Sequence, residues 1–522
     1  MKVVLLEHSR ERSSIHFNDV ANTPLSSCLM SGYVASYLCE HGIKTEIADF
    51  YTRGVAPSQM VELISQTECD VLGVNLVYCW EKTNDILHAL DEIHRRKQVP
   101  IIVFGFFPTF AFKTLLENYS CIDYIIMGEP ECTFLELVSM LKAGRDPGLI
   151  NGVSFVRKGE VVSNGRRPLI EDLDSLPFPR RTQDQLAATG GNILGSRGCY
   201  GNCTFCCINN FYGTGCQWRG RSSENIYDEA HILLTMLQEH YLYFVDANFF
   251  GPGRNGQVRA ETIAQLLSSE KGLTFGVECR VNDIQVASLK TLVDAGLRNV
   301  FLGVESASPS ALKRMRKQTT NDQTIKALAL LRNHGIEPHI GFIMFDPDSD
   351  LHDIRSNFDF LTSQDLLRKL SCTVQLLYHP EIVLMGTDTY RALERDRKIR
   401  LSSHNHYQAC CSFRHNEVHF LADCMGGVCR YLLERAEDPH SPIYWKHNTA
   451  MNNPSFHAVA TRLNDWLIEF FEEILGKIES KDIKITPQSK STIINDSKAT
   501  IETVINTPES SRCPSHSEGI GA

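Results

Sequence analysis

The sequence predicts an α/β protein that begins with a doubly wound parallel sheet, continues into a partial (β/α)6 barrel of TIM type and ends in a mainly helical region. Short apolar, β-branched segments alternate with amphipathic helical segments twice along the chain, which is typical of parallel β/α units. A stretch with turn residues and prolines separates the two series. At about 150 residues per domain, a chain of 522 residues has room for about three domains.

The composition excludes several classes of protein. The chain is 43% hydrophobic and 22% charged, as globular proteins are, and its net charge of −10 argues against a nucleic-acid partner. No apolar run is long enough to span a membrane, and Glu7, His8 and Arg10 interrupt any signal-peptide core. We therefore expect a cytoplasmic protein whose 18 cysteines are buried or bind metal rather than form disulfides.

The first series of β/α units is expected to form one domain over residues 1–145. The helical segments between its strands include residues 24–42, which Gly42 closes as a C-cap, and residues 84–97. Sheets of this kind bind ligands at the carboxyl ends of their strands. Strands are predicted over residues 2–7, 44–50, 70–78, 100–105 and 123–129.

A linker over residues 146–190 and a barrel over residues 191–380 follow. The linker contains a predicted hairpin with Asn164 and Gly165 at its tip, and then a proline-containing segment without regular structure. In the barrel, polar residues at the strand ends gather on one face, where barrels of this type carry out chemistry. Barrel strands are predicted over residues 192–197, 241–248, 273–280, 299–306, 337–345 and 372–380.

The C-terminal part is divided into a helical region over residues 381–480 and a tail over residues 481–522. A strong amphipathic helix is predicted over residues 456–480. The tail is rich in Ser, Thr, Lys, Asn and Pro, so we expect it to be disordered. Four cysteines of the helical region are interpreted either as buried thiols of a packed cap or as an auxiliary metal site: Cys410, Cys411, Cys424 and Cys429.

The segment "GSRGCYGNCTFCCINNFYG" places a cluster of cysteines directly after the first barrel strand. Cys199, Cys203 and Cys206 lie on one short loop, and three thiolates there can hold a soft metal centre. Zinc would need a fourth ligand, which Cys207 or Cys216 could supply. A four-iron cluster fits the triplet better, because three cysteines leave one iron open for an outside ligand. In that interpretation Cys207 and Cys216 are bystanders.

The cysteine triplet, with the aromatic Phe205 before its last member, resembles the radical S-adenosylmethionine superfamily. "FVDAN", "VECRV", "GVESAS" and "GFIMFDP" lie at later strand ends, where that family contacts S-adenosylmethionine. The resemblance implies that the triplet holds a 4Fe-4S cluster. The implied contacts to S-adenosylmethionine are Phe205, Asp246, Asn248, Glu278, Arg280, Glu305 and Ser306.

Each of these strand-end residues also has an ordinary structural interpretation. Asp246, Glu278 and Glu305 could be hydrogen-bonded loop residues, and Arg280 could simply pair with Glu278. The basic run over residues 313–317 is interpreted as a solvated helix face.

The first domain resembles the cobalamin-binding, flavodoxin-like domain that precedes the barrel in one subgroup of that superfamily. "GVNLVY", "VFGFFPTF", "IIMGEPECTFLEL" and "PLIEDLDSLPFPRR" carry the resemblance. The sequence around His16 lacks the Asp-x-His-x-x-Gly pattern of a histidine ligand to cobalt, and Phe106 stands where relatives often have a second glycine. The alternative is a doubly wound module without cofactor. The implied cobalamin contacts are Asn75, Tyr78, Gly105, Thr109, Gly128, Glu129 and Glu131.

The resemblance implies a cobalamin-dependent radical enzyme that methylates an unactivated carbon, or a phosphinate phosphorus, of a small molecule or natural product. Its cofactors would be a 4Fe-4S cluster, S-adenosylmethionine and cobalamin, and flavodoxin or ferredoxin would supply an electron. A non-methylating cyclisation or rearrangement is the first alternative. A non-catalytic cobalamin or redox sensor is the second. The sequence identifies neither a catalytic protein residue nor the substrate.

Overall fold

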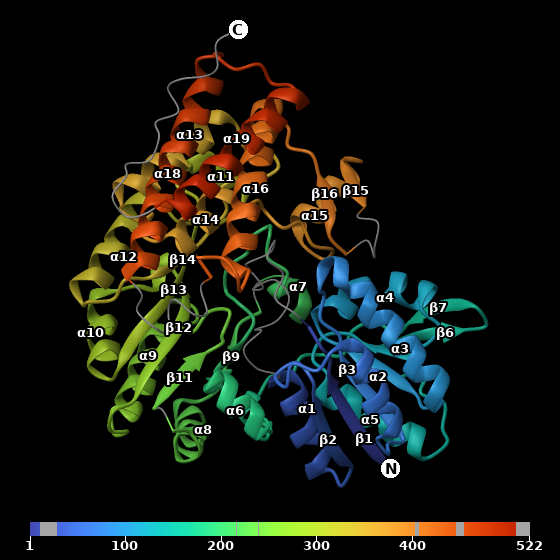
Figure 1. The fold of residues 1–522 in the computed structure, drawn as a ribbon. Helices are drawn as coiled ribbons and strands as arrows, with labels where there is room; N and C mark the ends of the chain where they lie inside the picture. The colour runs from blue at the N-terminus through green and yellow to red at the C-terminus, as the bar shows by residue number, and fades with distance from the viewer. Residues whose placement is uncertain are drawn as a thin grey trace.

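The computed structural model describes residues 1–10, 29–213, 215, 217–238, 240–401, 407–444 and 454–507. Two β/α domains lie next to each other, and the C-terminal helices cover one end of the second domain (Figure 1). The predicted order of a doubly wound sheet, a partial barrel and a helical cap is therefore confirmed.

The front domain is built on a seven-stranded sheet with the order β2-β1-β3-β4-β5-β6-β7. Its first five strands are parallel, and their order 2-1-3-4-5 is that of flavodoxin-like folds, as the resemblance implied. Helices α2, α3 and α4 pack on one face of the sheet, and α1 and α5 pack on the other. The elements are β1 Lys2–Glu7, α1 Leu29–Glu40, β2 Lys44–Asp49, α2 Pro57–Gln66, β3 Val71–Asn75, α3 Thr83–Lys97, β4 Ile101–Phe104, α4 Phe106–Asn118, β5 Tyr124–Ile126 and α5 Glu131–Lys142.

A hairpin of β6 (Val153–Arg157) and β7 (Glu160–Ser163) extends this sheet antiparallel to β5. Its tip is Lys158-Gly159, where both residues have positive φ (53° and 81°), as a tight hairpin turn requires. The prediction of a tip at Asn164-Gly165 was wrong. The side-chain amide of Asn164 instead donates hydrogen bonds to the carbonyls of Gly148 and Ile150 (3.1 and 3.0 Å).

The second domain contains a parallel five-stranded sheet with the order β14-β13-β12-β11-β8. Its helices follow the strands in sequence, as a partial barrel requires. The elements are α6 Gln183–Thr189, β8 Gly191–Ile193, β9 Ser196–Arg197, α7 Ile208–Tyr212, β10 Arg219–Gly220, α8 Ser223–Met236, β11 Tyr241–Phe244, α9 Gly253–Leu267, β12 Thr274–Arg280, α10 Val286–Asp294, β13 Leu297–Glu305, α11 Pro309–Arg314, α12 Asn321–Asn333, β14 His339–Phe342 and α13 Leu351–Ser363.

The sixth barrel strand, expected over residues 372–380, was a wrong prediction. These residues form helix α14 (Leu370–Tyr378), whose buried face includes Val374 and Leu377. A short apolar run suits a buried helix as well as a buried strand, so periodicity alone does not separate the two. A β-bridge between Phe345 and Pro380 lies where the sixth strand would have ended.

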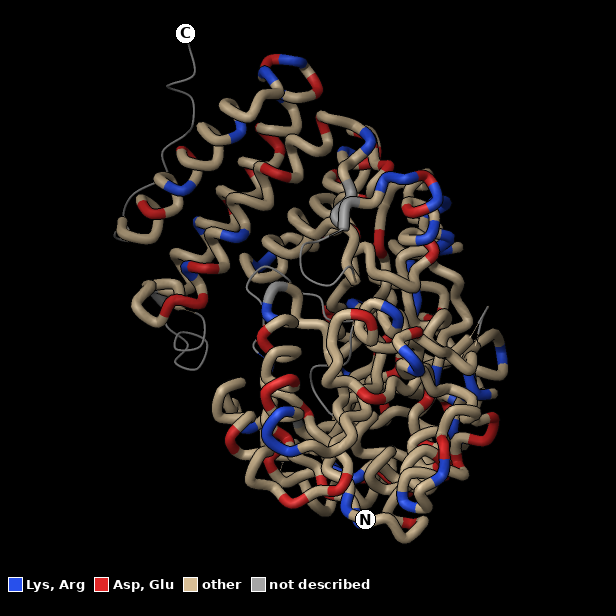
Figure 2. The backbone as a smooth tube through the Cα atoms, turned by 90° about the vertical axis from the view of Figure 1, so that its right-hand side faces the viewer, with Lys and Arg blue, Asp and Glu red and all other residues tan. Residues whose placement is uncertain are grey.

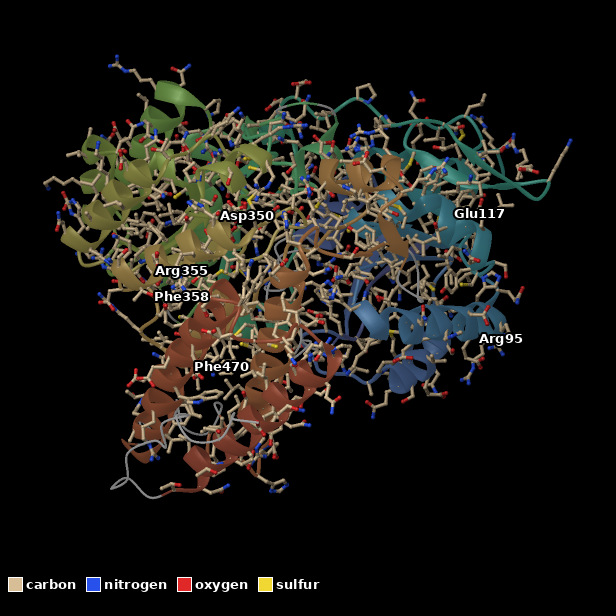
Figure 3. The ribbon with its side chains drawn as sticks, turned by 90° about the horizontal axis from the view of Figure 1, so that it is seen from above. Arg95, Glu117, Asp350, Arg355, Phe358 and Phe470 are labelled. Carbon is tan, nitrogen blue, oxygen red and sulfur yellow. The ribbon has the colours of Figure 1, made fainter. Side chains whose placement is uncertain are left out.

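The C-terminal helices pack on the barrel through α13 and α14. Phe358 of α13 stacks on Phe471 of α18 with ring centroids 4.8 Å apart. Figure 3 shows Arg355 and Phe358 close to Phe470, with Arg95 and Glu117 far away on the helices of the front domain. The elements are α15 Asp388–Arg395, β15 Ile399–Leu401, β16 Ala409–Cys411, α16 Asn416–Glu437, α18 Pro454–Glu479 and α19 Pro487–Asn506.

Helix α19 corrects the expectation of a disordered tail from residue 481 onward. Thr486 caps the helix by accepting a hydrogen bond from the backbone of Ser489, and Pro487 occupies its first turn. Ile493, Ile501 and Val504 are buried against the other cap helices. The polar composition conceals this apolar face, because its members are spread thinly among Ser, Thr and Lys. Residues 508–522 of the expected tail lie outside the described residues.

The surface is mixed in charge. Figure 2 shows Lys and Arg positions interspersed with Asp and Glu positions along the backbone. Among the helices of the described residues, none is both long enough and apolar enough to cross a membrane.

Candidate functional site between the two sheets

The cysteine loop, residues 198–207, leaves the barrel after β9 and ends at α7. Asn209 of α7 folds the loop back: its side-chain oxygen accepts from the backbone N–H of Cys199 (3.2 Å), and its amide donates to the carbonyl of Gly201. Gly198 has φ 85°, and a Cβ atom there would lie 1.6 Å from the carbonyl oxygen of Gln217. Only glycine fits this entry to the loop.

The structure brings the three predicted cluster ligands together. Burial raises the pKa of the Cys199 and Cys206 thiols, and the charge of Cys203 raises the pKa of both further. The guanidinium of Arg280 lies 3.3 Å from the Sγ of Cys203. Three soft sulfur donors beside a fixed positive charge suit an anionic iron–sulfur cluster. The ligand assignment itself stays a prediction.

Cys207 follows Cys206 directly, and its charge is one of the causes that raise the pKa of the Cys206 thiol. It is buried in an apolar cluster with Phe106 and Phe211, whose rings stack 4.0 Å apart across the domain boundary. This packing agrees with the interpretation of Cys207 as a bystander. Cys216 and His16 lie outside the described residues.

Arg280 reaches the cysteine loop because Gly201 lacks a side chain. A Cβ atom on Gly201 would lie 2.2 Å from Nη1 of Arg280. The guanidinium also lies over the ring of Tyr200 at 5.5 Å. No ion pair links Arg280 to Glu278 in the described part of the chain. Glu278 instead accepts a hydrogen bond from the hydroxyl of Tyr243 (3.2 Å), and burial raises its pKa to about 7.

Glu305 holds a second buried cation near the loop. Its carboxylate lies 2.8 Å from Nζ of Lys317, and both side chains are almost fully buried. The interpretation of residues 313–317 as a solvated face holds for Lys313 and Arg316, which are exposed. It was wrong for Lys317, which is buried, and Arg314 pairs with Asp346 at 2.7 Å. Lys317 was missed as a site residue, since its distance in sequence from Glu305 matches no motif.

The other predicted barrel contacts are bonded within the protein. Asp246 accepts hydrogen bonds from the hydroxyl of Ser196 and the backbone of Gly195, and burial raises its pKa to about 6. Asn248 donates to Asp283 (2.6 Å).

Two further predicted contacts lie near the later barrel strands. Ser306 donates to the side-chain oxygen of Asn357 (2.8 Å). Phe205 packs against Ile343 and Met315, so the structure brings it to the end of the fifth strand. The assignment of the barrel contacts to S-adenosylmethionine stays a prediction.

The carboxyl edge of the front sheet contains several of the predicted cobalamin residues. Thr109 ties two strand-end loops together: its hydroxyl donates to the carbonyl of Gly105 (2.6 Å) and accepts from the backbone of Gly128 (3.1 Å). Both glycines have positive φ (117° and 77°). Asn75 donates to Glu7 (2.9 Å), but its buried Oδ1 has no hydrogen-bond partner among the described residues.

This edge fits a flat ligand that approaches the backbone closely. A Cβ atom on Gly105 would lie 2.8 Å from Oδ1 of Asn75, so the Asn75 side chain can approach this backbone only because residue 105 is glycine. Tyr78 lies nearby, packed edge-on against Tyr407 with ring centroids 4.9 Å apart. These features suit a planar cofactor such as cobalamin.

Glu129 and Glu131 join the two domains. Arg197, two residues before the cysteine loop's first cysteine, lies 2.8 Å from Glu129 and 2.6 Å from Glu131. Arg219 adds a contact to Glu129 at 3.1 Å, and all four side chains are buried. Although burial acts to raise it, Arg197 and Arg219 lower the pKa of Glu129. We call these four residues the interdomain clamp, which no sequence motif indicates.

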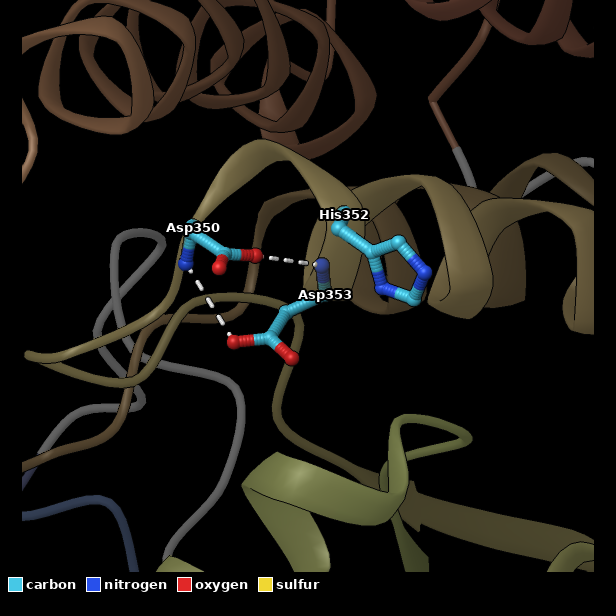
Figure 4. A group of neighbouring side chains, drawn as sticks. All are labelled: Asp350, His352 and Asp353. Atoms are coloured by element: carbon cyan, nitrogen blue, oxygen red, sulfur yellow. Dashed lines mark hydrogen bonds between the residues drawn. The ribbon is translucent and has the colours of Figure 1, made fainter.

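Asp350, His352 and Asp353 form a group of metal-binding residue types outside the cysteine loop. Asp350 caps helix α13 by accepting from the backbone of Asp353 (2.9 Å), as Figure 4 shows. The carboxylate of Asp353 accepts hydrogen bonds from the guanidinium of Arg314 and from the hydroxyls of Ser308 and Ser310. His352 is exposed beside it.

The four cysteines of the C-terminal region lie on two different elements. Cys424 and Cys429 are buried in helix α16, where burial raises the pKa of both thiols. Cys410 and Cys411 belong to strand β16.

The fold places a second, doubly wound sheet against the end of the partial barrel that carries the cysteine loop. Residues 193–361 match the family model of the Radical SAM superfamily, so the chain contains a radical SAM domain.

Two curated relatives are similar to the chain over most of its length. An uncharacterised methyltransferase of Pyrococcus horikoshii is 27% identical over 383 residues, which cover 70% of this chain and 79% of that protein. The 4′-phospho-dehydrooxetanocin synthase of Priestia megaterium is 28% identical over 370 residues, covering 65% of this chain and 49% of the synthase. This chain thus spans about half the length of the second relative.

Two solved structures have the same fold. The cobalamin-dependent S-adenosylmethionine radical enzyme OxsB, with aqua-cobalamin and S-adenosylmethionine bound, gives a TM-score of 0.76 at 21% identity, covering 96% of this chain and 79% of OxsB. The radical S-adenosylmethionine methyltransferase TsrM from Kitasatospora setae, with cobalamin and a [4Fe-4S] cluster bound, gives a TM-score of 0.64 at 15% identity. The match covers 92% of this chain and 99% of TsrM.

Proposed function

We propose that this chain is a cobalamin-dependent radical S-adenosylmethionine enzyme that methylates an unactivated carbon, or a phosphinate phosphorus, of a small molecule. One observation carries the proposal: the clamp holds the cysteine loop of the barrel against the carboxyl edge of the front sheet. Two strand-end edges that meet in this way would bring two cofactor sites next to each other. The likeness to TsrM, a radical S-adenosylmethionine methyltransferase, supports the proposal.

When bound, the cluster, S-adenosylmethionine and cobalamin would supply the radical and methyl-transfer chemistry. The chain's own residues hold and orient these groups. Cys199, Cys203 and Cys206 would hold the cluster, while Arg280 supplies positive charge beside Cys203. The positive-φ glycines at the strand ends, Gly105 and Gly128, would let the backbone come close to the flat face of cobalamin. A reductant such as flavodoxin or ferredoxin would deliver the electron.

A non-methylating rearrangement or cyclisation is the second candidate. It is favoured by the likeness to the Priestia megaterium relative, which is a synthase, and to OxsB, which is a cobalamin-dependent S-adenosylmethionine radical enzyme. Both candidates use the same cofactors, so the products must separate them.

The test is anaerobic reconstitution with iron, sulfide and cobalamin, followed by reduction and product analysis. Methyl transfer yields 5′-deoxyadenosine together with S-adenosylhomocysteine. If 5′-deoxyadenosine forms without S-adenosylhomocysteine, the second candidate replaces the first. If the reduced protein cleaves no S-adenosylmethionine, it is not a radical enzyme.

A pair of cysteine variants tests the site. Cys203→Ala should lose the iron–sulfur absorption band and keep the cobalamin spectrum, because the two groups bind to different domains. Cys207→Ala is the matched control and should keep both bands, since Cys207 packs among apolar side chains. Loss of the iron–sulfur band in both variants would contradict the ligand assignment.

A further inference from the structure

Glu381 occupies the place where the sixth barrel strand would have ended. It follows Pro380, which bridges to Phe345, and its backbone N–H donates to the carbonyl of Phe345 (2.8 Å). Its side chain is buried, with 8% of the residue exposed. Glu381 therefore lies at the carboxyl end of the barrel, the end that carries chemistry in this fold.

Two neighbouring segments place Glu381 between the cysteine loop and the front domain. The hydroxyl of Thr389 bonds to its carboxyl group, and the backbone N–H of Thr389 donates to the carbonyl of Thr204 in the cysteine loop (3.0 Å). On the other side, the residues after Glu381 pack into the core of the front domain, with Leu384 buried near Tyr407. Glu381 thus lies where the two proposed cofactor sites meet.

The carboxyl group of Glu381 is incompletely satisfied. Its buried Oε1 has no hydrogen-bond partner among the described residues. Buried polar atoms are bonded in the great majority of cases, so an exception at the mouth of a barrel points to a ligand.

The surrounding charges specify the chemistry of that ligand. Asp346 and Asp348 act on Glu381 from the loop after β14, and the cation that acts on it, Arg314, is already bound to Asp346 and Asp353. Burial is the largest cause of a pKa raised to about 8, and the two aspartates raise it further. An N–H donor with a positive charge would satisfy Oε1 and also supply the missing counter-charge. A neutral hydroxyl would satisfy only the hydrogen bond.

We propose that Glu381 binds an amino group of the substrate, an inference that rests on the proposed function for the identity of the site. The substrate is then an amine that enters as its ammonium form. Glu381 releases its proton to water as the ammonium binds, and the ion pair holds the substrate between the cysteine loop and the front sheet. No bond of the substrate is broken at this step.

The test uses infrared difference spectroscopy on the reconstituted holoenzyme at pH 7, with n-propylamine and 1-propanol as matched probes. The wild type should show the carbonyl band of a protonated carboxyl group that is missing in Glu381→Gln. Propylamine should remove this band by deprotonating Glu381, and 1-propanol should leave it in place. Glu337→Gln, at an exposed carboxylate paired with Arg332, is the control and should behave as the wild type.

Four results would overturn the inference. The band could be absent from the wild type, it could respond equally to both probes or to neither, or the response to propylamine could persist in Glu381→Gln. The fourth is a tenfold loss of S-adenosylmethionine affinity in Glu381→Gln, which would assign the carboxyl group to that cofactor instead. The spectra need no turnover, so their outcome is independent of whether the wild type cleaves S-adenosylmethionine.

Discussion

His8 is a buried histidine at the carboxyl end of β1 whose two ring nitrogens both have backbone partners. Nδ1 lies 2.9 Å from the carbonyl of Ser9, and Nε2 lies 3.0 Å from the backbone N–H of Val77. Because an N–H donates to Nε2, the proton of the neutral ring is assigned to Nδ1. Burial lowers the pKa of His8 to about 3, so the ring stays neutral at all ordinary pH values.

This histidine should make stability fall as the solution is acidified. Between about pH 6.5 and pH 3, the unfolded chain binds a proton at His8 and the folded chain does not. At pH 5 the free energy of unfolding should therefore be about 2 kcal/mol lower than at pH 8 on account of this group. Urea unfolding of the wild type and His8→Gln at both pH values measures the difference. Equal pH dependence in the two proteins would contradict the assignment.

Lys317 and Glu305 form a buried pair whose members depend on each other. Lys317→Met should lower the free energy of unfolding by about 3–5 kcal/mol, because it leaves the Glu305 carboxylate buried without a counter-charge. The double variant Lys317→Met with Glu305→Gln should recover most of that loss. Urea unfolding of the apoprotein measures both. A single variant as stable as the wild type would mean that Glu305 is solvated.

Local spacing predicted some residues of the site and missed others for a physical reason. The three cysteines lie within a few positions of one short loop, so the folding of that loop alone brings them close together. Arg197, Lys317 and Glu381 act through partners that other elements bring to them: Arg197 bonds to residues 66 and 68 positions away. No sequence pattern encodes such pairs, since the partners become neighbours only after the chain has folded.

Helices with one apolar face and strands of continuous apolar residues were predicted well. Elements whose form depends on tertiary packing were not. The front-domain strands appear within a few residues of their expected positions, because parallel buried strands are continuous apolar runs. Helix α14 replaced an expected strand, since the same apolar run can be buried in either form. Helix α19 was missed because its stability comes from its contacts with α16 and α18.

The buried face of α19 can be tested with one core substitution. Ile501 is fully buried against the cap, so Ile501→Ala should cost about 2–5 kcal/mol of unfolding free energy through lost packing and a residual cavity. Thr492→Ala, at an exposed position of the same helix, is the control and should change stability by less than about 0.5 kcal/mol. Denaturant unfolding measures both. Equal effects would mean that α19 does not dock on the cap.

At the scale of the whole molecule, the interdomain clamp makes the front domain and the barrel one unit. Arg197→Met would leave Glu129 paired with Arg219 and Glu131 without an ion-pair partner among the described residues, both in a buried site. We expect a loss of about 3–5 kcal/mol and earlier cleavage in the linker between the domains during limited proteolysis. Arg157→Met removes an exposed pair with Asp146 and should change neither by a measurable amount. Unchanged proteolysis of Arg197→Met would show that apolar contacts alone hold the domains together.

The clamp also limits how this architecture can be recombined. A barrel supplied with the front domain of a different protein would bury Arg197 and Arg219 without counter-charges, unless the incoming domain carried acidic residues at the positions of Glu129 and Glu131. The two halves are therefore not interchangeable modules. Chimeras between distant relatives should fold only where these four positions are transferred as a set. The charges of the clamp therefore decide which front domains can pack on which barrels.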